Sequence, residues 1–274
     1  MTISTHTIVC NEERYIWYSL MSVANYVEKL IVWDTGSTDS TVEIIKEVEK
    51  KLGDKLEFRQ LGKVGPSELT ELRQKMLAAT KSDWFIILDG DEVWWDSSIR
   101  KLVKTINRDG EKLNCLVSPY YNLIGDIYHY QEDSISKYVI DGRKGFLNIR
   151  AVNTKIPGLN VVNPYPKEAY VNENGIFLQE MPKKERKLVE AKYLHFTHLL
   201  RSGNVSKNSE ATLRGKKYKY EIGNEFPLDF YYPEVFFRER PNNVNSVWEI
   251  NDAGYYLRAN VETALRKLKR KFMK

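Results

Sequence analysis

The sequence WFIILDGDE occupies residues 84–92 and joins an apolar run to a carboxylate-rich turn. Its five leading residues contain no polar break, which is the pattern of a strand covered on both faces of a sheet. Asp89 and Asp91 follow directly, and Gly90 between them permits a tight turn. Carboxylates at this spacing suit a hard divalent cation. The turn therefore predicts a metal site, and its alternative interpretation is an acidic cap for a helix that starts near Asp96.

The chain before this turn alternates strand and helix patterns. Short apolar runs typical of buried strands lie at 7–10, 30–33 and 56–61. Between them, apolar residues recur three or four positions apart, as in one face of a helix, over 16–27, 42–52 and 69–79. Such alternation implies right-handed crossovers and a mostly parallel sheet. We therefore expect an α/β fold with helices on both faces, the second helix being capped by Thr38 or Asp39.

Polar residues follow the ends of the predicted strands. Asn11 and Glu12 follow the first strand, and Asp34 ends the second. Ligands of open parallel sheets bind beyond the carboxyl ends of the strands, so we expect these residues to lie along one edge with Asp89 and Asp91. Asp34 precedes a helix N-terminus, whose dipole is positive, and its carboxylate suits a ribose or a base. The alternative is an ordinary strand–turn–helix cap.

Three motifs stand in order in this half of the chain: NE at 11–12, DTGSTDST at 34–41 and DGDE at 89–92. Through them the chain resembles the family-2 glycosyltransferases of the GT-A fold over about residues 6–96. The resemblance implies a Rossmann-like, GT-A-type fold and a hexosyltransferase-like enzyme. It also implies a nucleoside diphosphate sugar donor, with a UDP-sugar favoured, a Mn²⁺ or Mg²⁺ ion, and inversion at the anomeric carbon.

The resemblance also implies roles for single residues. Those expected to contact the donor lie in the first half of the chain: Asn11, Glu12, Asp34, Arg73 and Asp89. Asp91 would chelate the metal and so take part in catalysis, and Asp89 would support the ribose or the metal. Gln74 stands where the family often has Asn.

The second half offers weaker candidates. His195, in the sequence LHFTH, resembles a late family histidine and is expected at the metal or the diphosphate, with His198 in reserve. The alternative for either is an ordinary core or surface histidine. For the catalytic base, which must take a proton from the acceptor hydroxyl, we choose Glu168, with Glu173 and Asp133 as substitutes.

Composition bounds the class of protein. The chain has 274 residues, of which 42% are hydrophobic and 29% charged, an ordinary globular profile. No apolar run exceeds five residues, far short of the ~20 that cross a bilayer. The opening residues lack signal-peptide features, so we expect a cytoplasmic protein. Cys10 and Cys115 lie in apolar runs without CxxC spacing, so we expect both to be buried and reduced.

From about residue 112 the strand–helix alternation gives way to an aromatic, loop-rich region with strands expected at 113–117, 146–150 and 192–196. We expect a catalytic domain over 1–225, with its nucleotide-sugar half at about 1–120 and its acceptor half at about 121–225. Residues 226–274 would form a C-terminal extension. The acceptor would be a carbohydrate or another hydroxyl compound, including a lipid-linked glycan or a nucleic acid.

The C-terminal tail is basic, with six basic residues and one acidic residue over 262–274. Residues 258–274 form an amphipathic helix pattern with Val261, Leu265, Leu268 and Phe272 on one side. We expect this side to pack on the domain, the alternative being peripheral contact with an anionic membrane.

Two other functions stay open. One is a non-enzymatic basic module that binds an anionic polymer or a membrane. The other is a DxD phosphatase of the haloacid-dehalogenase type, in which the first Asp is the nucleophile. That family usually carries the motif on its opening strand, whereas here 88 residues precede it.

Overall fold

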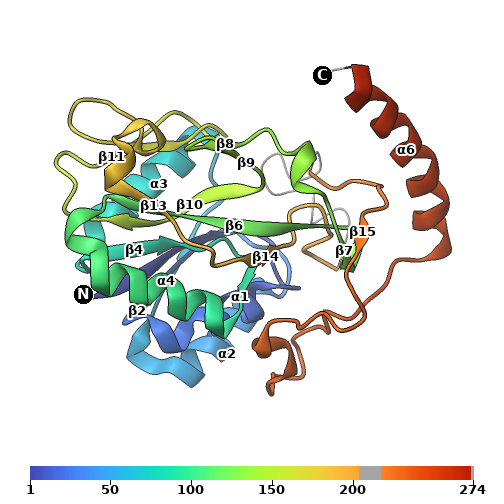
Figure 1. The fold of residues 1–274 in the computed structure, drawn as a ribbon. Coiled ribbons are helices and arrows are strands. Elements are labelled where there is room, and N and C mark those ends of the chain that lie inside the picture. Colours follow the sequence, from blue (N-terminus) through green and yellow to red (C-terminus); the bar gives the residue numbers. More distant parts are fainter. Residues whose placement is uncertain (204–216, 273–274) are drawn as a thin grey trace.

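A computed structural model describes residues 1–203 and 217–272, and one large sheet forms its centre (Figure 1). Four parallel strands make up its first half: β1 (Ile3–Val9), β2 (Lys29–Thr35), β3 (Leu56–Leu61) and β4 (Trp84–Ile87). Their order in space is β3-β2-β1-β4. Since all four run in the same direction, the segments that follow β1, β2 and β4 leave from the same edge of the sheet.

Helices cover both faces of this half. They are α1 (Ile16–Val23), α2 (Thr41–Leu52), α3 (Pro66–Ala79) and α4 (Asp96–Asp109). On β2, Leu30 and Val32 belong to the main core together with α1, α2 and α4. The alternate residue Trp33 packs with Leu72 and Met76 of α3 on the other face. The expected α/β class, with a mostly parallel sheet and helices on both faces, is confirmed.

The sheet continues with strands from the second half of the chain. β10 (Leu147–Asn153) lies antiparallel between β4 and β6 (Cys115–Ile124), and β7 (Asp126–Tyr130) and β15 (Asn224–Glu225) extend the edge. β13 (Arg186–Leu188) and β14 (Tyr193–His195) run parallel to β6. β14 also pairs with β5 (Glu92–Trp94), which sets His195 opposite Glu92. This pairing brings the late histidine to the DGDE turn.

Smaller elements complete the fold. Two separate two-stranded sheets pair β8 (Val139–Ile140) with β9 (Arg143–Lys144) and β11 (Asn160–Val162) with β12 (Ala169–Val171). Short 3-10 helices lie at Ala24–Tyr26, Gly53–Lys55, Gly110–Lys112, Asp133–Ile135, Leu178–Glu180, Lys183–Glu185 and Glu234–Phe237.

Two predicted boundaries differ from the structure. β1 begins at Ile3 rather than at residue 7, because the buried polar residues Ser4, Thr5 and His6 hide its apolar pattern. α1 ends at Val23 rather than at residue 27, since the chain tightens into a 3-10 turn there. The expected cap of α2 at Thr38 or Asp39 is wrong, because Ser40 occupies the N-cap position and its side chain makes no capping hydrogen bond. Asp39, one residue earlier, accepts a hydrogen bond of 3.1 Å from the Thr41 N–H.

The C-terminal region ends in a long helix, α6 (Ala253–Phe272). Before it, Phe226, Val235 and Val247 join the main core, so both sides of the expected domain boundary share one core, and the division at residue 225 stays a prediction. The expectation that the apolar stripe of α6 packs on the domain is wrong, because every member of the stripe is more than half exposed. Within the described ranges, no helix combines the length and the apolar character needed to cross a membrane.

Candidate active site

The turns after β1 and β2 are tied into one hydrogen-bonded unit. Asp34 Oδ2 accepts the backbone N–H groups of Gly36 and Ser37, each at 3.1 Å. Asn11 Oδ1 accepts the N–H of Thr38 at 2.7 Å. Gly36 has φ 89°, and a Cβ there would lie only 3.0 Å from the Lys63 backbone, so the turn requires glycine. Asp34 and Asn11 are both buried, and their hydrogen bonds fix the shape of the turn.

A cavity of about 540 Å³ opens at the strand ends, a size suited to a small molecule. From the first half of the chain its walls include Glu12, Thr38, Arg73, Asp89 and Asp91, and from the second half Arg150, Glu168, His195, Arg201 and Lys217. Cys10 also lines it and is half-buried, so the expectation of full burial holds for Cys115 and is wrong for Cys10. The two halves of the chain therefore build one cavity.

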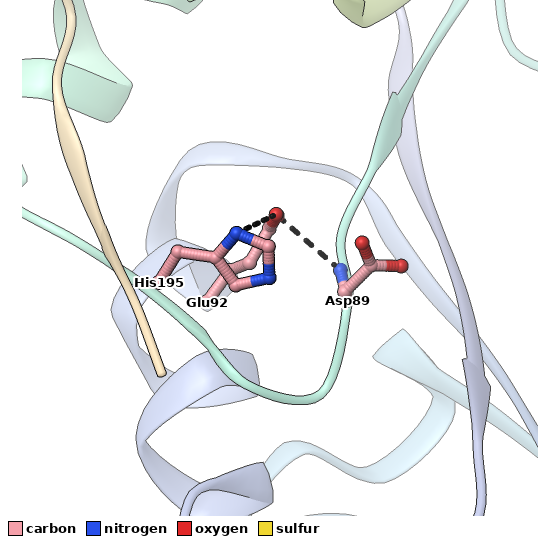
Figure 2. A group of neighbouring side chains, drawn as sticks. All are labelled: Asp89, Glu92 and His195. Atoms are coloured by element: carbon pink, nitrogen blue, oxygen red, sulfur yellow. Dashed lines mark hydrogen bonds and ion pairs between the residues drawn. The ribbon is translucent and has the colours of Figure 1, made fainter. Parts of the chain in front are cut away.

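An acidic cluster with one histidine lies at the cavity wall. One ligand atom each from Asp89, Glu92 and His195 lies within 4.8 Å of the others, and Figure 2 shows the three side chains together. His195 Nε2 lies 3.4 Å from Asp91 Oδ2. The predicted candidates Asp89, Asp91 and His195 thus meet in space. Glu92 joins them, although the sequence analysis gave it no role.

Three arginines partner these carboxylates, and two of them, Arg150 and Arg201, are buried. Arg201 Nη1 lies 2.8 Å from Glu12 Oε1 and 3.1 Å from Asp91 Oδ2. Arg150 forms an ion pair with Glu92 and donates to the Tyr193 hydroxyl oxygen at 2.7 Å. Isolated arginines carry no motif, so Arg150 and Arg201 were missed by the sequence analysis.

The third arginine, Arg73, was predicted to face the donor. It lies on α3 with its Nε 3.5 Å from Glu168 Oε1 and its Nη2 4.0 Å from Asp89 Oδ1. Arg73 therefore links the DGDE turn to the residue chosen as the base.

Burial and charge set the protonation states in this cluster. Burial opposes a charge on Asp91, but the adjacent Arg201 guanidinium outweighs it and holds the pKa of this carboxyl below its usual range. Burial raises the pKa of Glu92 well above its usual range despite the adjacent Arg150. Burial also lowers the pKa of His195, so its ring is neutral near pH 7. Asp91 therefore offers a charged ligand and His195 a neutral one.

The donor set fits a divalent cation. Carboxylate oxygens are the ligands that Mn²⁺ and Mg²⁺ prefer, and a neutral imidazole can supply one nitrogen. His195 Nδ1 is buried without a hydrogen-bond partner within the described residues. A buried ring nitrogen beside carboxylates is suited to ligate such a cation.

The three candidates for the catalytic base differ in the solvent exposure of their side chains. Glu168 lines the cavity just before β12, and its Oε2 is buried without a hydrogen-bond partner among the residues described. Glu173 and Asp133 are exposed and do not line this cavity. The geometry favours Glu168, whose role stays a prediction.

Two other residues that the sequence singled out, His198 and Gln74, make structural hydrogen bonds. His198 is buried, and its Nδ1 lies 2.7 Å from the Lys217 carbonyl oxygen, to which it donates. Gln74 Oε1 accepts the Val161 N–H at 2.9 Å and so joins α3 to β11.

Comparison with known proteins identifies the family. The model of glycosyl transferase family 2 matches residues 4–161. The chain is 30% identical over 124 residues to the SPbeta prophage-derived glycosyltransferase SunS of Bacillus subtilis, covering 43% of this chain and 27% of SunS. It is 37% identical over 91 residues to the uncharacterized glycosyltransferase RT0209 of Rickettsia typhi, covering 33% and 28%. The alignments thus span about a quarter of these relatives' lengths.

Among solved structures, Staphylococcus aureus TarS 1–349 is similar with a TM-score of 0.48 and 17% identity, over 77% of this chain and 65% of that one. The family model, by contrast, includes all three motifs and the four parallel strands. Since this match covers more than half of the sequence, the chain belongs to glycosyl transferase family 2.

Proposed function

We propose that the protein transfers a hexose-type sugar from a nucleoside diphosphate sugar, with a UDP-sugar favoured, to a hydroxyl acceptor. The observation that carries the proposal is the meeting of Asp89, Asp91 and His195 on one wall of a cavity, with Glu92 buried beside them, in a chain of this family. A basic binding module needs no such cluster of carboxylates, and the cluster supports an enzyme instead.

The metal-binding part of the proposal assigns Asp89, Asp91, Glu92 and His195 as the residues that would hold Mn²⁺ or Mg²⁺. The cation would supply neutralisation of the charge that develops on the diphosphate leaving group. Arg201 keeps Asp91 ionised, and Arg150 holds Glu92 in place. Arg73 and Lys217 line the cavity as further cations suited to phosphate oxygens.

The nucleoside part assigns the turns after β1 and β2. Glu12, Gly36 and Thr38 line the cavity and offer a carboxylate, a backbone edge and a hydroxyl. Asn11 and Asp34 hold these turns in shape through the hydrogen bonds to residues 36–38. We keep both as nucleoside-binding residues, acting chiefly through the turn that they support.

The acceptor part assigns Glu168 as the base that takes the proton from the acceptor hydroxyl while the glycosidic bond forms. A single displacement of this kind inverts the anomeric carbon. Tyr120, Tyr138 and Tyr165 line the same cavity, and their rings suit the apolar faces of sugars. The proposed acceptor class is a carbohydrate or another hydroxyl compound, which includes lipid-linked and nucleic-acid acceptors.

A thermal-shift screen tests the donor and the metal together. The whole chain is heated with UDP-, GDP-, CDP- and dTDP-sugars, with and without Mn²⁺. We expect one nucleotide, UDP first, to raise Tm only when Mn²⁺ is present, because the phosphates and the carboxylates need a shared cation. The control is Asp91→Asn, which should lose this shift. A screen in which no nucleotide stabilises the protein under either condition would count against the proposal.

A further inference from the structure

The C-terminal helix α6 turns its apolar side chains to the outside of the molecule. Leu257, Val261, Leu265, Leu268 and Phe272 are each more than half exposed, and we name them the α6 stripe. They follow one another at spacings of four, four, three and four residues, which places them on one face of the helix. A row of five exposed apolar side chains on one helix face indicates a site of interaction. Figure 1 shows α6 at the edge of the molecule, away from the central sheet.

The opposite face of α6 attaches it to the protein. Ala259 is buried, and Thr263 Oγ1 accepts the N–H of Ile222 at 2.8 Å. Arg270 forms a two-pronged ion pair with Glu221 at 2.7 and 3.0 Å. A rotation that buried the α6 stripe would break all of these contacts. The outward orientation is therefore set by specific interactions with the segment 219–222.

Basic residues border the stripe. Within 253–272 the sequence holds six basic residues and one acidic residue. The acidic one, Glu262, is paired with Arg258 at 2.7 Å and with Arg266 at 2.8 Å, so its charge is compensated. Arg258 follows Leu257, and the exposed Lys269 follows Leu268, so both cations lie beside the stripe. A helix with this pattern suits a bilayer interface, where apolar side chains enter the acyl boundary and cations meet anionic headgroups.

The same bordering cations disfavour the packing of a second copy of α6 on the α6 stripe. Two copies packed through the stripe would bring their bordering cations together, and like charges in an interface repel. The spacing also departs from the alternating three and four of a coiled-coil seam. We propose that the α6 stripe docks the protein on an anionic lipid surface.

The segment that holds α6 begins close to a residue of the candidate active site. α6 holds residues 219–222, and Lys217, two residues earlier, lines the cavity. The hydroxyl of Tyr255 on α6 donates to the Lys219 carbonyl oxygen at 3.0 Å. The proposal goes beyond glycosyl transfer and does not depend on it, since vesicle binding is measured without donor or acceptor.

Vesicle flotation of the full chain tests the proposal. The probes are vesicles of equal parts phosphatidylglycerol and phosphatidylcholine, and vesicles of phosphatidylcholine alone. We expect the protein to float with the anionic vesicles and to be released by high salt. The double variant Leu265→Ser/Leu268→Ser should reduce the bound fraction by about tenfold or more, because two large apolar side chains are lost from the interface. Leu228→Ser, which removes an exposed leucine outside α6, is the matched control.

A charge-reversal variant tests the electrostatic contribution to vesicle binding in a protein that remains folded. Lys269→Glu should weaken binding to the anionic vesicles, whereas Lys46→Glu, on the exposed side of α2, should not. Circular dichroism confirms that each variant is folded. Flotation of the double variant at the wild-type level would overturn the proposal, as would equal binding to both kinds of vesicle. A dimer in sedimentation velocity that the double variant dissociates would overturn it in favour of a second copy.

Discussion

Arg201 Nη1 lies 3.1 Å from Asp91 Oδ2, although the two residues come from opposite halves of the chain. Arg201 also holds Glu12 at 2.8 Å, so one guanidinium joins the turn after β1 to the turn after β4. β14 pairs with β5 and so places His195 opposite Glu92, and the chain then continues from β14 to Arg201. The late segment thus completes a site that the first half begins.

Replacement of this arginine should destabilise the fold. Arg201→Met removes the guanidinium shared by two buried carboxylates, and we expect the free energy of unfolding to fall by about 3–5 kcal/mol. Urea denaturation measures the change. The control is Arg143→Met, whose ion pair with Glu190 is half-exposed and should cost at most about 1 kcal/mol. Equal losses in the two variants would contradict the buried role of Arg201.

Glu168→Gln tests the assigned base. The amide cannot take a proton from the acceptor, so kcat should fall by about a hundredfold or more while KM for the donor stays near its original value. Steady-state transfer assays measure both constants. Glu173→Gln alters an exposed carboxylate outside the cavity and should keep wild-type rates. A Glu168→Gln enzyme with normal kcat would rule this residue out.

Asp34→Ala tests the turn after β2. The variant leaves the N–H groups of Gly36 and Ser37 without their carboxylate acceptor, so the turn should lose its shape. We expect nucleotide affinity, measured by calorimetry, to fall about tenfold, with Mn²⁺ binding in the absence of nucleotide unchanged. Asp54→Ala, an exposed aspartate after α2, serves as control. Unchanged nucleotide affinity in Asp34→Ala would show that the turn does not contribute.

His6 on β1 is placed to make stability depend on pH. Its ring stacks on Phe85 with centroids 4.0 Å apart, and Nε2 lies 2.6 Å from Thr80 Oγ1. Because this hydroxyl donates to the Met76 carbonyl oxygen, we assign the ring proton to Nε2. Nδ1 is then buried without a partner in the described part of the chain. A second proton on the ring would therefore find no acceptor.

Burial, with a smaller effect of Arg73, lowers the pKa of His6 from 6.5 to about 3. Between these values the unfolded chain binds a proton that the folded protein does not, so stability falls as pH decreases below about 6.5. At about pH 5 this costs about 2 kcal/mol relative to neutral pH. Denaturation of wild type and His6→Gln at both pH values should show the larger acid loss in wild type. Equal losses would contradict this assignment.

The α/β half of the fold is predictable because its signals are local. The apolar run before Asp89 and the helix periodicity of α2 and α3 depend only on neighbours in sequence. The same holds for the polar residues at the strand ends. Asp89 and Asp91 meet at the cavity because parallel strands place their carboxyl ends on one edge.

The rest of the site depends on contacts between distant segments. Arg150 reaches Glu92 because β10 pairs antiparallel with β4, and nothing in the sequence around residue 150 indicates that pairing. The orientation of α6 likewise depends on contacts between distant segments. Periodicity identifies its stripe, but the helix is held by Tyr255, Thr263 and Arg270, which bind the segment 219–222 from the opposite face.

Titration of Mn²⁺ followed by electron paramagnetic resonance tests the central claim most directly, that the carboxylates at the strand ends and His195 share one divalent cation with a diphosphate. For wild type we predict one Mn²⁺ site whose affinity rises when UDP is added, and at least about a tenfold weaker site in Asp91→Asn and in His195→Gln. His198→Gln, which alters a histidine bonded to the backbone, should keep the site. Mn²⁺ binding that is the same in wild type and Asp91→Asn, with and without UDP, would contradict the account.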